Sequence, residues 1–138
     1  MANALYDKGR EKFLGHATID LDWINDNIKA LLVDTALYTV DLVNHEFLSD
    51  IAAAARVATS GNLTAKTAAA GVADSTDPTI TAVSGASVEA VVLYKDTGAP
   101  STSPLIAYLD TMTGLPFTPN GGDVILQWDN GANKIFKL

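Results

Sequence analysis

Carboxylate and histidine side chains are the residues of this 138-residue sequence that are chemically suited to a site. Asp20, Asp22 and Asp26 fall within the stretch DLDWINDN, and closely spaced carboxylates are typical Ca²⁺ ligands. An EF-hand loop starting at Asp20 would need Gly at its sixth position and Glu at its twelfth. Those positions hold Asn25 and Leu31. The spacing therefore favours a solvated acidic turn over a calcium site.

The other candidates for chemistry are isolated. His16 and His45 are the only histidines, they are far apart in the sequence, and there is no cysteine, so a zinc site of His and Cys ligands is not predicted. Asp110 ends an apolar run, but the sequence shows no catalytic motif at useful spacing from it, and Gly121-Gly122 lacks the Lys-Ser or Lys-Thr pair of a phosphate loop. The sequence has no G-x-S-x-G nucleophile motif. We therefore expect no enzymatic activity, no metal and no cofactor.

The charge balance argues against two classes of partner. Sixteen acidic and nine basic residues give a net charge of −7, whereas surfaces that bind nucleic acid or anionic membranes gather cations. The first residues, MANALYDKGREKFLG, carry charges where a secretion signal needs an apolar core. No apolar run approaches the ~20 residues of a membrane helix. We expect neither nucleic acid nor a membrane as a partner.

The elements that would position any site are one helix and many strands. Asn3 is a plausible N-cap, Gly15 is a plausible stop, and apolar side chains recur on one face between them, which predicts a short N-terminal helix. A helical turn is predicted at 45–50, capped by Asn44. Turn residues divide the rest of the chain into short strands. The expected strands are 18–22, 27–34, 55–60, 66–73, 78–84, 88–96, 104–111, 123–129 and 133–138.

About eight short strands at this spacing, with Gly, Pro, Asn and Ser between them, predict an all-β, antiparallel sandwich with a single domain over residues 1–138. The dipeptide Asn130-Gly131 lies between two of the predicted strands. Asn and Gly tolerate the positive φ of a type I′ turn. We therefore predict that strands 123–129 and 133–138 form a hairpin.

Three strands are apolar on both faces, although one face of an antiparallel sheet is usually polar. In VEAVVLYKD, Ala90, Val92 and Tyr94 oppose Val91 and Leu93. Two other stretches alternate in the same way. In LIAYLD, the expected faces are Leu105, Ala107 and Leu109 against Ile106 and Tyr108; in NIKALLVD, they are Ile28, Ala30 and Leu32 against Leu31 and Val33. The second face must be covered either by the helix and loops of this chain or by another protein.

Several phrases of the sequence resemble small virion proteins of tailed bacteriophages. They are YDKGREKFLG, IKALLVD, YTVDL followed by HEFLSDI, ARVATSG, VLYKDTG, LIAYLDT with GLPFTPNGGD, and QWDNGANKIFKL, from residue 5 to the last residue. The similarity is to the cement, or head-decoration, proteins of these phages. It implies a jelly-roll β-sandwich, made in the host cytoplasm, that binds the outer surface of a capsid shell as a homodimer. The implied partner is the major capsid protein of an HK97-type shell, and a homotrimer is the alternative assembly.

The N-terminal helix and arm, residues 1–24, are the segment we expect to contact neighbouring chains. Basic residues of the segment would meet an acidic shell, and buried aromatic side chains often dominate interfaces. The predicted contact residues are Leu5, Tyr6, Lys8, Arg10, Lys12, Phe13, Leu14 and Trp23. Packing of this helix on its own sandwich is the open alternative. A carbohydrate- or receptor-binding module of a tail fibre or spike is the alternative function, and it would expose Trp23 or Trp128 beside polar side chains.

Overall fold

A computed structural model describes residues 3–15 and 19–138. Its largest element is a five-stranded antiparallel sheet in the order β1-β7-β6-β2-β3. Two separate antiparallel pairs, β4–β9 and β5–β8, complete the strands. The strands are β1 Ala4–Leu5, β2 Ile28–Val33, β3 Arg56–Thr59, β4 Val72–Ala73, β5 Thr79–Ile80, β6 Ala90–Lys95, β7 Leu105–Leu109, β8 Val124–Ile125 and β9 Phe136–Lys137.

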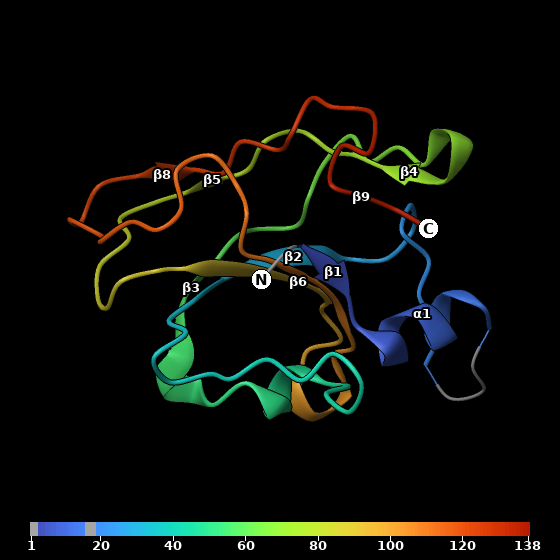
Figure 1. Ribbon diagram of the computed structural model, residues 1–138, viewed down its shortest axis with the longest axis horizontal. Coiled ribbons are helices and arrows are strands. Elements are labelled where there is room, and N and C mark those ends of the chain that lie inside the picture. Colours follow the sequence, from blue (N-terminus) through green and yellow to red (C-terminus); the bar gives the residue numbers. More distant parts are fainter. Residues whose placement is uncertain (1–2, 16–18) are drawn as a thin grey trace.

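Both faces of the five-stranded sheet are covered by other parts of the same chain (Figure 1). The pairs β4–β9 and β5–β8 lie over one face, which we call the strand-covered face. Residues 34–55 lie over the other, which we call the loop-covered face. The chain also forms four short 3₁₀ helices. Two lie in the loop cover, η1 Leu48–Asp50 and η2 Ala53–Ala55; η3 Ala69–Gly71 precedes β4, and η4 Pro100–Thr102 lies between β6 and β7. The protein is thus an all-β, antiparallel sandwich with one α-helix, α1 (Asp7–Phe13).

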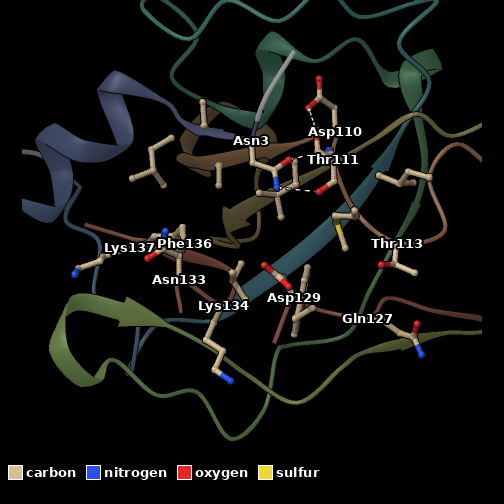
Figure 2. A pocket seen from close by; sticks show the side chains of 18 of the residues that line it. Asn3, Asp110, Thr111, Thr113, Gln127, Asp129, Asn133, Lys134, Phe136 and Lys137 are labelled. Carbon is tan, nitrogen blue, oxygen red and sulfur yellow. Dashed lines mark hydrogen bonds between the residues drawn. The ribbon is translucent and has the colours of Figure 1, made fainter. Parts of the chain in front are cut away.

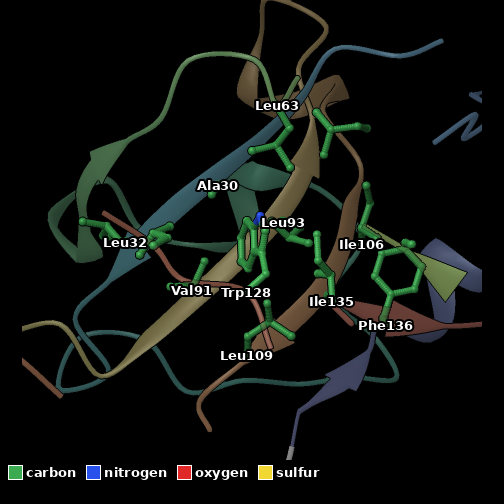
Figure 3. Packing of buried hydrophobic residues seen from close by; sticks show 14 of the residues in the cluster. Ala30, Leu32, Leu63, Val91, Leu93, Ile106, Leu109, Trp128, Ile135 and Phe136 are labelled. Carbon is green, nitrogen blue, oxygen red and sulfur yellow. The ribbon is translucent and has the colours of Figure 1, made fainter. Parts of the chain in front are cut away.

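The two-sided apolar strands are explained by these coverings. On β6, Val91 and Leu93 belong to the core of the strand-covered face, while Ala90, Val92 and Tyr94 belong to that of the loop-covered face. This alternation was predicted, and so was that of β2. Figure 3 shows Leu93 and Ile106 of the sheet packing beneath the aromatic rings of the strand-covered face. The sequence left open whether this chain or another protein covers the second face. In the structure, segments of this chain cover both faces.

A register shift corrects the predicted alternation of β7. Leu93 lies opposite Ala107, but the next residue, Tyr94, lies opposite Leu105. Ile106 is therefore the extra residue of a β-bulge. The bulge reverses which face of the sheet the preceding side chains point to. As a result, Leu105 joins the loop-covered face, and Ile106 joins the same core as Ala107.

The N-terminal helix begins later than predicted. Ala4 and Leu5 form β1, which pairs with β7, and the N-cap of α1 is Tyr6. Asn3 is therefore not the cap. Instead, its side-chain oxygen accepts the backbone N–H of Thr111 at 2.8 Å and its amide donates to the Thr111 carbonyl at 3.1 Å. The predicted stop is confirmed, because Gly15 follows the C-cap with a φ of +93°.

The predicted C-terminal hairpin is wrong. β8 pairs with β5, and β9 pairs with β4. Residues 126–135 therefore connect two different strand pairs. Gly131 is not in the left-handed region, and the residue of this turn with positive φ is Lys134 (+45°). The Gly131 N–H donates to the Asp129 side chain at 3.1 Å, and the Lys134 N–H donates to the Gly131 carbonyl at 3.2 Å.

The predicted strands of the sheet core are confirmed, and the outer ones shorten. β2, β3, β6 and β7 lie within 27–34, 55–60, 88–96 and 104–111. The outer strands each keep two residues. The predicted strand 18–22 begins outside the described residues, and 19–22 form no strand. The turn at 45–50 is present as η1, but Asp50 caps it by accepting the N–H groups of Glu46 (2.7 Å) and Phe47 (3.0 Å).

Candidate functional site

A polar cleft of about 830 Å³ opens between the β1–β7 edge of the sheet and the connection from β8 to β9. Figure 2 shows Asn3 and Thr111, joined by their hydrogen bonds, on one side of it, and Asp129 and Lys134 on another. Leu109 and Phe136 contribute apolar lining. The cleft thus offers carboxylate, amide and ammonium groups around an apolar interior.

The residues that line this cleft are suited to binding a ligand through hydrogen bonds. None of the described residues that line it is His, Cys or Ser. Asp110, the isolated carboxylate of the sequence, lies here beside Thr111, whose hydroxyl donates to it at 3.1 Å. The arrangement suits a polar ligand held by amides and charges, and it presents no nucleophile beside a histidine base.

An apolar groove of about 420 Å³ lies at the other end of the N-terminal segment. Its aromatic wall consists of three rings. Phe136 meets Trp23 edge-on, with ring centroids 5.2 Å apart, and meets Phe13 at 6.1 Å. Ile24 and Leu138 line the groove and remain 46% and 59% exposed. We call this site the apolar groove.

Four of the predicted contact residues are core residues. Leu5, Tyr6, Lys12 and Trp23 are buried within the chain. Leu5 and Trp23 pack in the core of the strand-covered face, and Tyr6 packs in that of the loop-covered face. Their burial does not favour direct contact with a neighbouring chain, although Lys12 and Trp23 also line the apolar groove. The same apolar pattern that suggests an interface helix also describes a helix packed on its own sheet.

Lys12 is held inside by two partners. Its Nζ lies 2.5 Å from Glu46 Oε1 and 5.2 Å from the centroid of the Phe47 ring. A buried ammonium needs such compensation, because its desolvation is expensive. Its charge is therefore satisfied within the chain and is not presented to a partner.

The other four predicted contact residues retain exposure. Leu14 is 89% exposed, and Phe13 is half-buried against Phe136. Lys8 pairs with Glu11 at 3.6 Å and Arg10 pairs with Asp7 at 3.3 Å, both along the surface of α1. Exposed pairs of this kind contribute little to stability. These four residues stay candidates for intermolecular contact.

The acidic stretch at 20–26 forms a closed turn. Asp22 accepts the N–H groups of Ile24 and Asn25 at 3.1 Å each and the Asn25 amide at 2.7 Å. These donors, the Asn25 side chain first, lower the pKa of Asp22. Asp26 pairs with Lys95 at 3.1 Å. Among the described residues, no group of three or more His, Cys, Asp or Glu side chains is arranged to hold a metal ion.

An equivalent turn occurs at 41–45. Asp41 accepts the N–H groups of Val43 and Asn44 at 3.0 Å each and the Asn44 amide at 2.9 Å. The repeated spacing Asp-x-x-Asn therefore places Val43 (59% exposed) in the position that Ile24 has in the first turn. This repeat is the signal in the sequence that could have pointed to Ile24 as a displayed side chain.

The two histidines are not brought together as a site. His45 is the partly buried end of a hydrogen-bond network: its Nδ1 lies 2.8 Å from the Tyr38 hydroxyl, which is 2.9 Å from the buried Tyr6 hydroxyl. The backbone N–H of Asp41 also donates to Nδ1, at 3.2 Å. Nδ1 therefore acts as a hydrogen-bond acceptor toward the Asp41 N–H. His16 lies outside the described residues.

Both tryptophans are buried. Trp23 Nε1 donates to the Thr67 carbonyl at 3.0 Å, and Trp128 Nε1 donates to the Ser75 hydroxyl at 2.9 Å. Neither indole presents the exposed ring that the carbohydrate-binding alternative requires. None of the described helices is long and apolar enough to cross a membrane. No protein-family model and no curated protein matches this chain.

Proposed function

We propose that this protein is a structural virion protein that binds the outer surface of a tailed-phage capsid and cements neighbouring major capsid proteins. The observation that carries the proposal is the apolar groove. It is a preformed concave surface with exposed Ile24 and Leu138, at the N-terminal segment expected to dock. The resemblance to head-decoration proteins supplies the identity of the partner. An HK97-type shell is the surface that this resemblance implies.

The assembly state rests on the resemblance alone. The apolar faces of the central strands give no support for a dimer interface, because the chain's own segments cover both of them. A homodimer on the capsid, with a trimer as the alternative, is therefore proposed without support from an unpartnered sheet face. Counting copies per binding position in a capsid map would distinguish the two.

The sandwich is proposed to be a jelly roll. Three strand pairs are nested in the sequence: β6 with β7, β5 with β8 and β4 with β9. Nested antiparallel pairs form the folded ribbon from which jelly rolls are wound, and this nesting supports the proposal. Thr79 and Ile125 are directly opposed and both exposed. Double replacement with Cys should yield an intramolecular disulfide, since the chain has no other thiol. Failure to oxidise would contradict the β5–β8 pairing.

The experiment that tests the function is decoration of capsids. Purified protein is mixed with phage capsids that lack it, unbound protein is removed by sedimentation, and bound copies are counted by gel densitometry against the major capsid protein. A cement protein is expected to bind in hundreds of copies per shell. No association with capsids would overturn the proposal.

A carbohydrate- or receptor-binding module remains the second candidate, and the polar cleft favours it. Asp129, Asn133 and Gln127 are hydrogen-bonding groups suited to sugar hydroxyls. This module would be present in tens of copies or fewer and would map to a fibre or spike. Labelling of the protein on intact particles separates the two locations.

A further inference from the structure

We infer that the apolar groove binds an extended segment of a partner polypeptide that presents one large apolar side chain flanked by Lys or Arg. The inference deepens the proposed function, because it states the chemistry of the capsid segment that would be bound. It rests on the proposed function for the identity of that partner, and on the groove alone for the chemistry.

The aromatic wall of the groove favours an apolar side chain on the bound segment. Phe13, Trp23 and Phe136 form a connected set of rings, and Ile24 and Leu138 extend it to the surface. The volume of about 420 Å³ lies within the usual range of ligand sites. A Leu or Phe side chain would bury the exposed parts of Ile24 and Leu138, and burial of apolar area is favourable at about 25 cal/mol per Å².

The acidic rim of the groove favours Lys or Arg on either side of that apolar side chain. Asp20 and Asp22 line it and are exposed, and neither forms an ion pair with a described residue within 4.0 Å. The cation that lines the groove, Lys12, is buried and already paired with Glu46. Lys66 acts on Asp22 electrostatically but does not line the groove, so among the described lining residues the exposed charge is negative. It complements Lys or Arg and fixes the orientation of a bound segment.

The rim is also held in place before binding. The Asp22–Asn25 turn fixes the backbone at Ile24, and Trp23 Nε1 is anchored on Thr67. Lys95 Nζ donates to the Asp20 carbonyl at 3.0 Å. A preformed site saves the cost of ordering loops on binding.

A second copy of this chain fits the groove less well. A twofold interface would place the same patch of both copies together. Asp20 and Asp22 would then face the same carboxylates of the other copy, in a chain of net charge −7. Like charges brought together at an interface are unfavourable. The charge pattern therefore selects a basic partner.

The test uses the full chain and three short peptides in NMR titrations at low salt. The probe is acetyl-Gly-Lys-Leu-Lys-Gly-amide, and the controls replace either both Lys with Glu or the Leu with Ser. We expect millimolar or tighter binding of the probe alone, with amide shifts at residues 20–24 and 136–138. Equal binding of all three peptides, or shifts elsewhere, would overturn the inference.

Two matched variants assign the effect to the groove. Ile24→Ser should weaken binding of the probe about three- to tenfold, because it removes an exposed apolar contact. Val43→Ser is the control, since Val43 has the same position in the second Asp-x-x-Asn turn but does not line the groove. Asp20→Asn should weaken binding and reduce its salt dependence. Equal behaviour of Ile24→Ser and Val43→Ser would contradict the assignment.

Capsid decoration separates this inference from the proposed function. If the natural protein decorates capsids and Ile24→Ser does not, both stand. If the natural protein and Ile24→Ser decorate capsids equally, the groove is not the docking site, although the protein remains a cement protein. If the natural protein fails to decorate, the proposed function falls, and the peptide titration alone decides the chemistry of the groove. If Ile24→Ser instead dissociates a dimer and no peptide binds, the occupant is a second copy and the inference is overturned.

Discussion

The two faces of the central sheet are buried by different means. Over the strand-covered face, two antiparallel pairs supply the cover, and both tryptophans and Phe136 lie in its core. Over the loop-covered face, 3₁₀ turns and the isolated bridge between Phe47 and Pro104 take the place of strands. All four tyrosines of the protein lie in this second core: Tyr6, Tyr38, Tyr94 and Tyr108.

The difference shows how the backbone of a cover determines the side chains beneath it. Paired strands satisfy their own N–H and C=O groups, so their inward side chains can be apolar. An irregular segment lacks such a ladder, and side chains must take its place. Asp34, Asp41 and Asp50 each accept backbone N–H groups in the loop cover, and the hydroxyls of Tyr6 and Tyr38 join it to the sheet. The loop-covered face therefore depends on particular polar groups and the strand-covered face on packing.

Alkaline pH should have the largest effect, because it destabilises the loop-covered face through its buried tyrosines. Burial, the largest cause, raises the pKa of Tyr38 to about 12 and raises the pKa of Tyr6 further. Below pH ~10 both the folded and unfolded chains keep the phenolic proton. Above pH ~10 the unfolded chain loses it while the folded chain does not, so stability falls as pH rises toward 12. Tyr38 alone accounts for a loss of about 3 kcal/mol.

Urea unfolding between pH 8 and 12 measures this loss. Tyrosine ionisation, followed by ultraviolet absorbance, reports the loop-covered face, and tryptophan fluorescence reports the strand-covered face. We expect ionisation to coincide with unfolding. Tyrosines that ionise near pH 10 in a chain with unchanged fluorescence would contradict the burial of this face.

Replacement of Gly9 should disturb both faces at once, because α1 joins them. Tyr6, at the start of α1, belongs to one core, and Phe13, at its end, packs on the other. A Cβ on Gly9 would lie 2.6 Å from the Leu105 carbonyl oxygen of β7. Gly9→Ala gains up to about 1 kcal/mol in helix propensity but forces α1 off the sheet, for a net loss of about 2 kcal/mol.

Thermal and urea unfolding of Gly9→Ala provide the measurement. Gly61→Ala is the matched control, because no described residue lies within 4 Å of the position that its methyl group would take, and its φ is not positive. Equal stability of the two variants would mean that α1 does not approach β7 so closely.

The hydroxyl network should make the loop-covered face sensitive to a single atom. Tyr38→Phe removes the oxygen that joins Tyr6 to His45 and leaves the fully buried Tyr6 hydroxyl without this partner. The expected loss is about 1 kcal/mol. Tyr108→Phe, on the same face, should have a smaller effect, since its hydroxyl is not part of this network. If both variants lost the same stability in urea unfolding, the hydroxyl network would not contribute specifically to the stability of this face.

The central strands could be predicted from the sequence, and the covers could not. Alternation on β2 and β6 is a local signal, because neighbouring residues point to opposite faces. The bulge at Ile106 interrupts that signal, and nothing in LIAYLD marks it. The pairs β4–β9 and β5–β8 join residues far apart in the sequence through two residues each, which is too short for periodicity to reveal.

The packing partners of the candidate contact residues could not be predicted for a related reason. Apolar residues at helical spacing show that one face is buried but not what covers it. The pattern around Tyr6 and Trp23 therefore does not reveal that each has a partner, Tyr38 and Phe136, later in the same chain. The groove residues Ile24 and Leu138 have no pattern of their own, apart from the Asp-x-x-Asn turn that displays Ile24.

The smallest expected effect lies in the connection from β8 to β9, which belongs to the strand-covered face. A type I′ hairpin would place Gly131 at positive φ, and Gly131→Ala would then cost about 1 kcal/mol. In this structure Lys134 has the positive φ, and a Cβ on Gly131 would meet only the exposed side chain of Asp129, at 3.0 Å. Because that side chain can turn away, Gly131→Ala should change stability by less than about 0.5 kcal/mol, whereas Lys134→Gly should raise it by up to about 1 kcal/mol. Differential scanning calorimetry of the two variants distinguishes the arrangements, since a hairpin centred on Asn130-Gly131 predicts a clear loss for the first and no gain for the second.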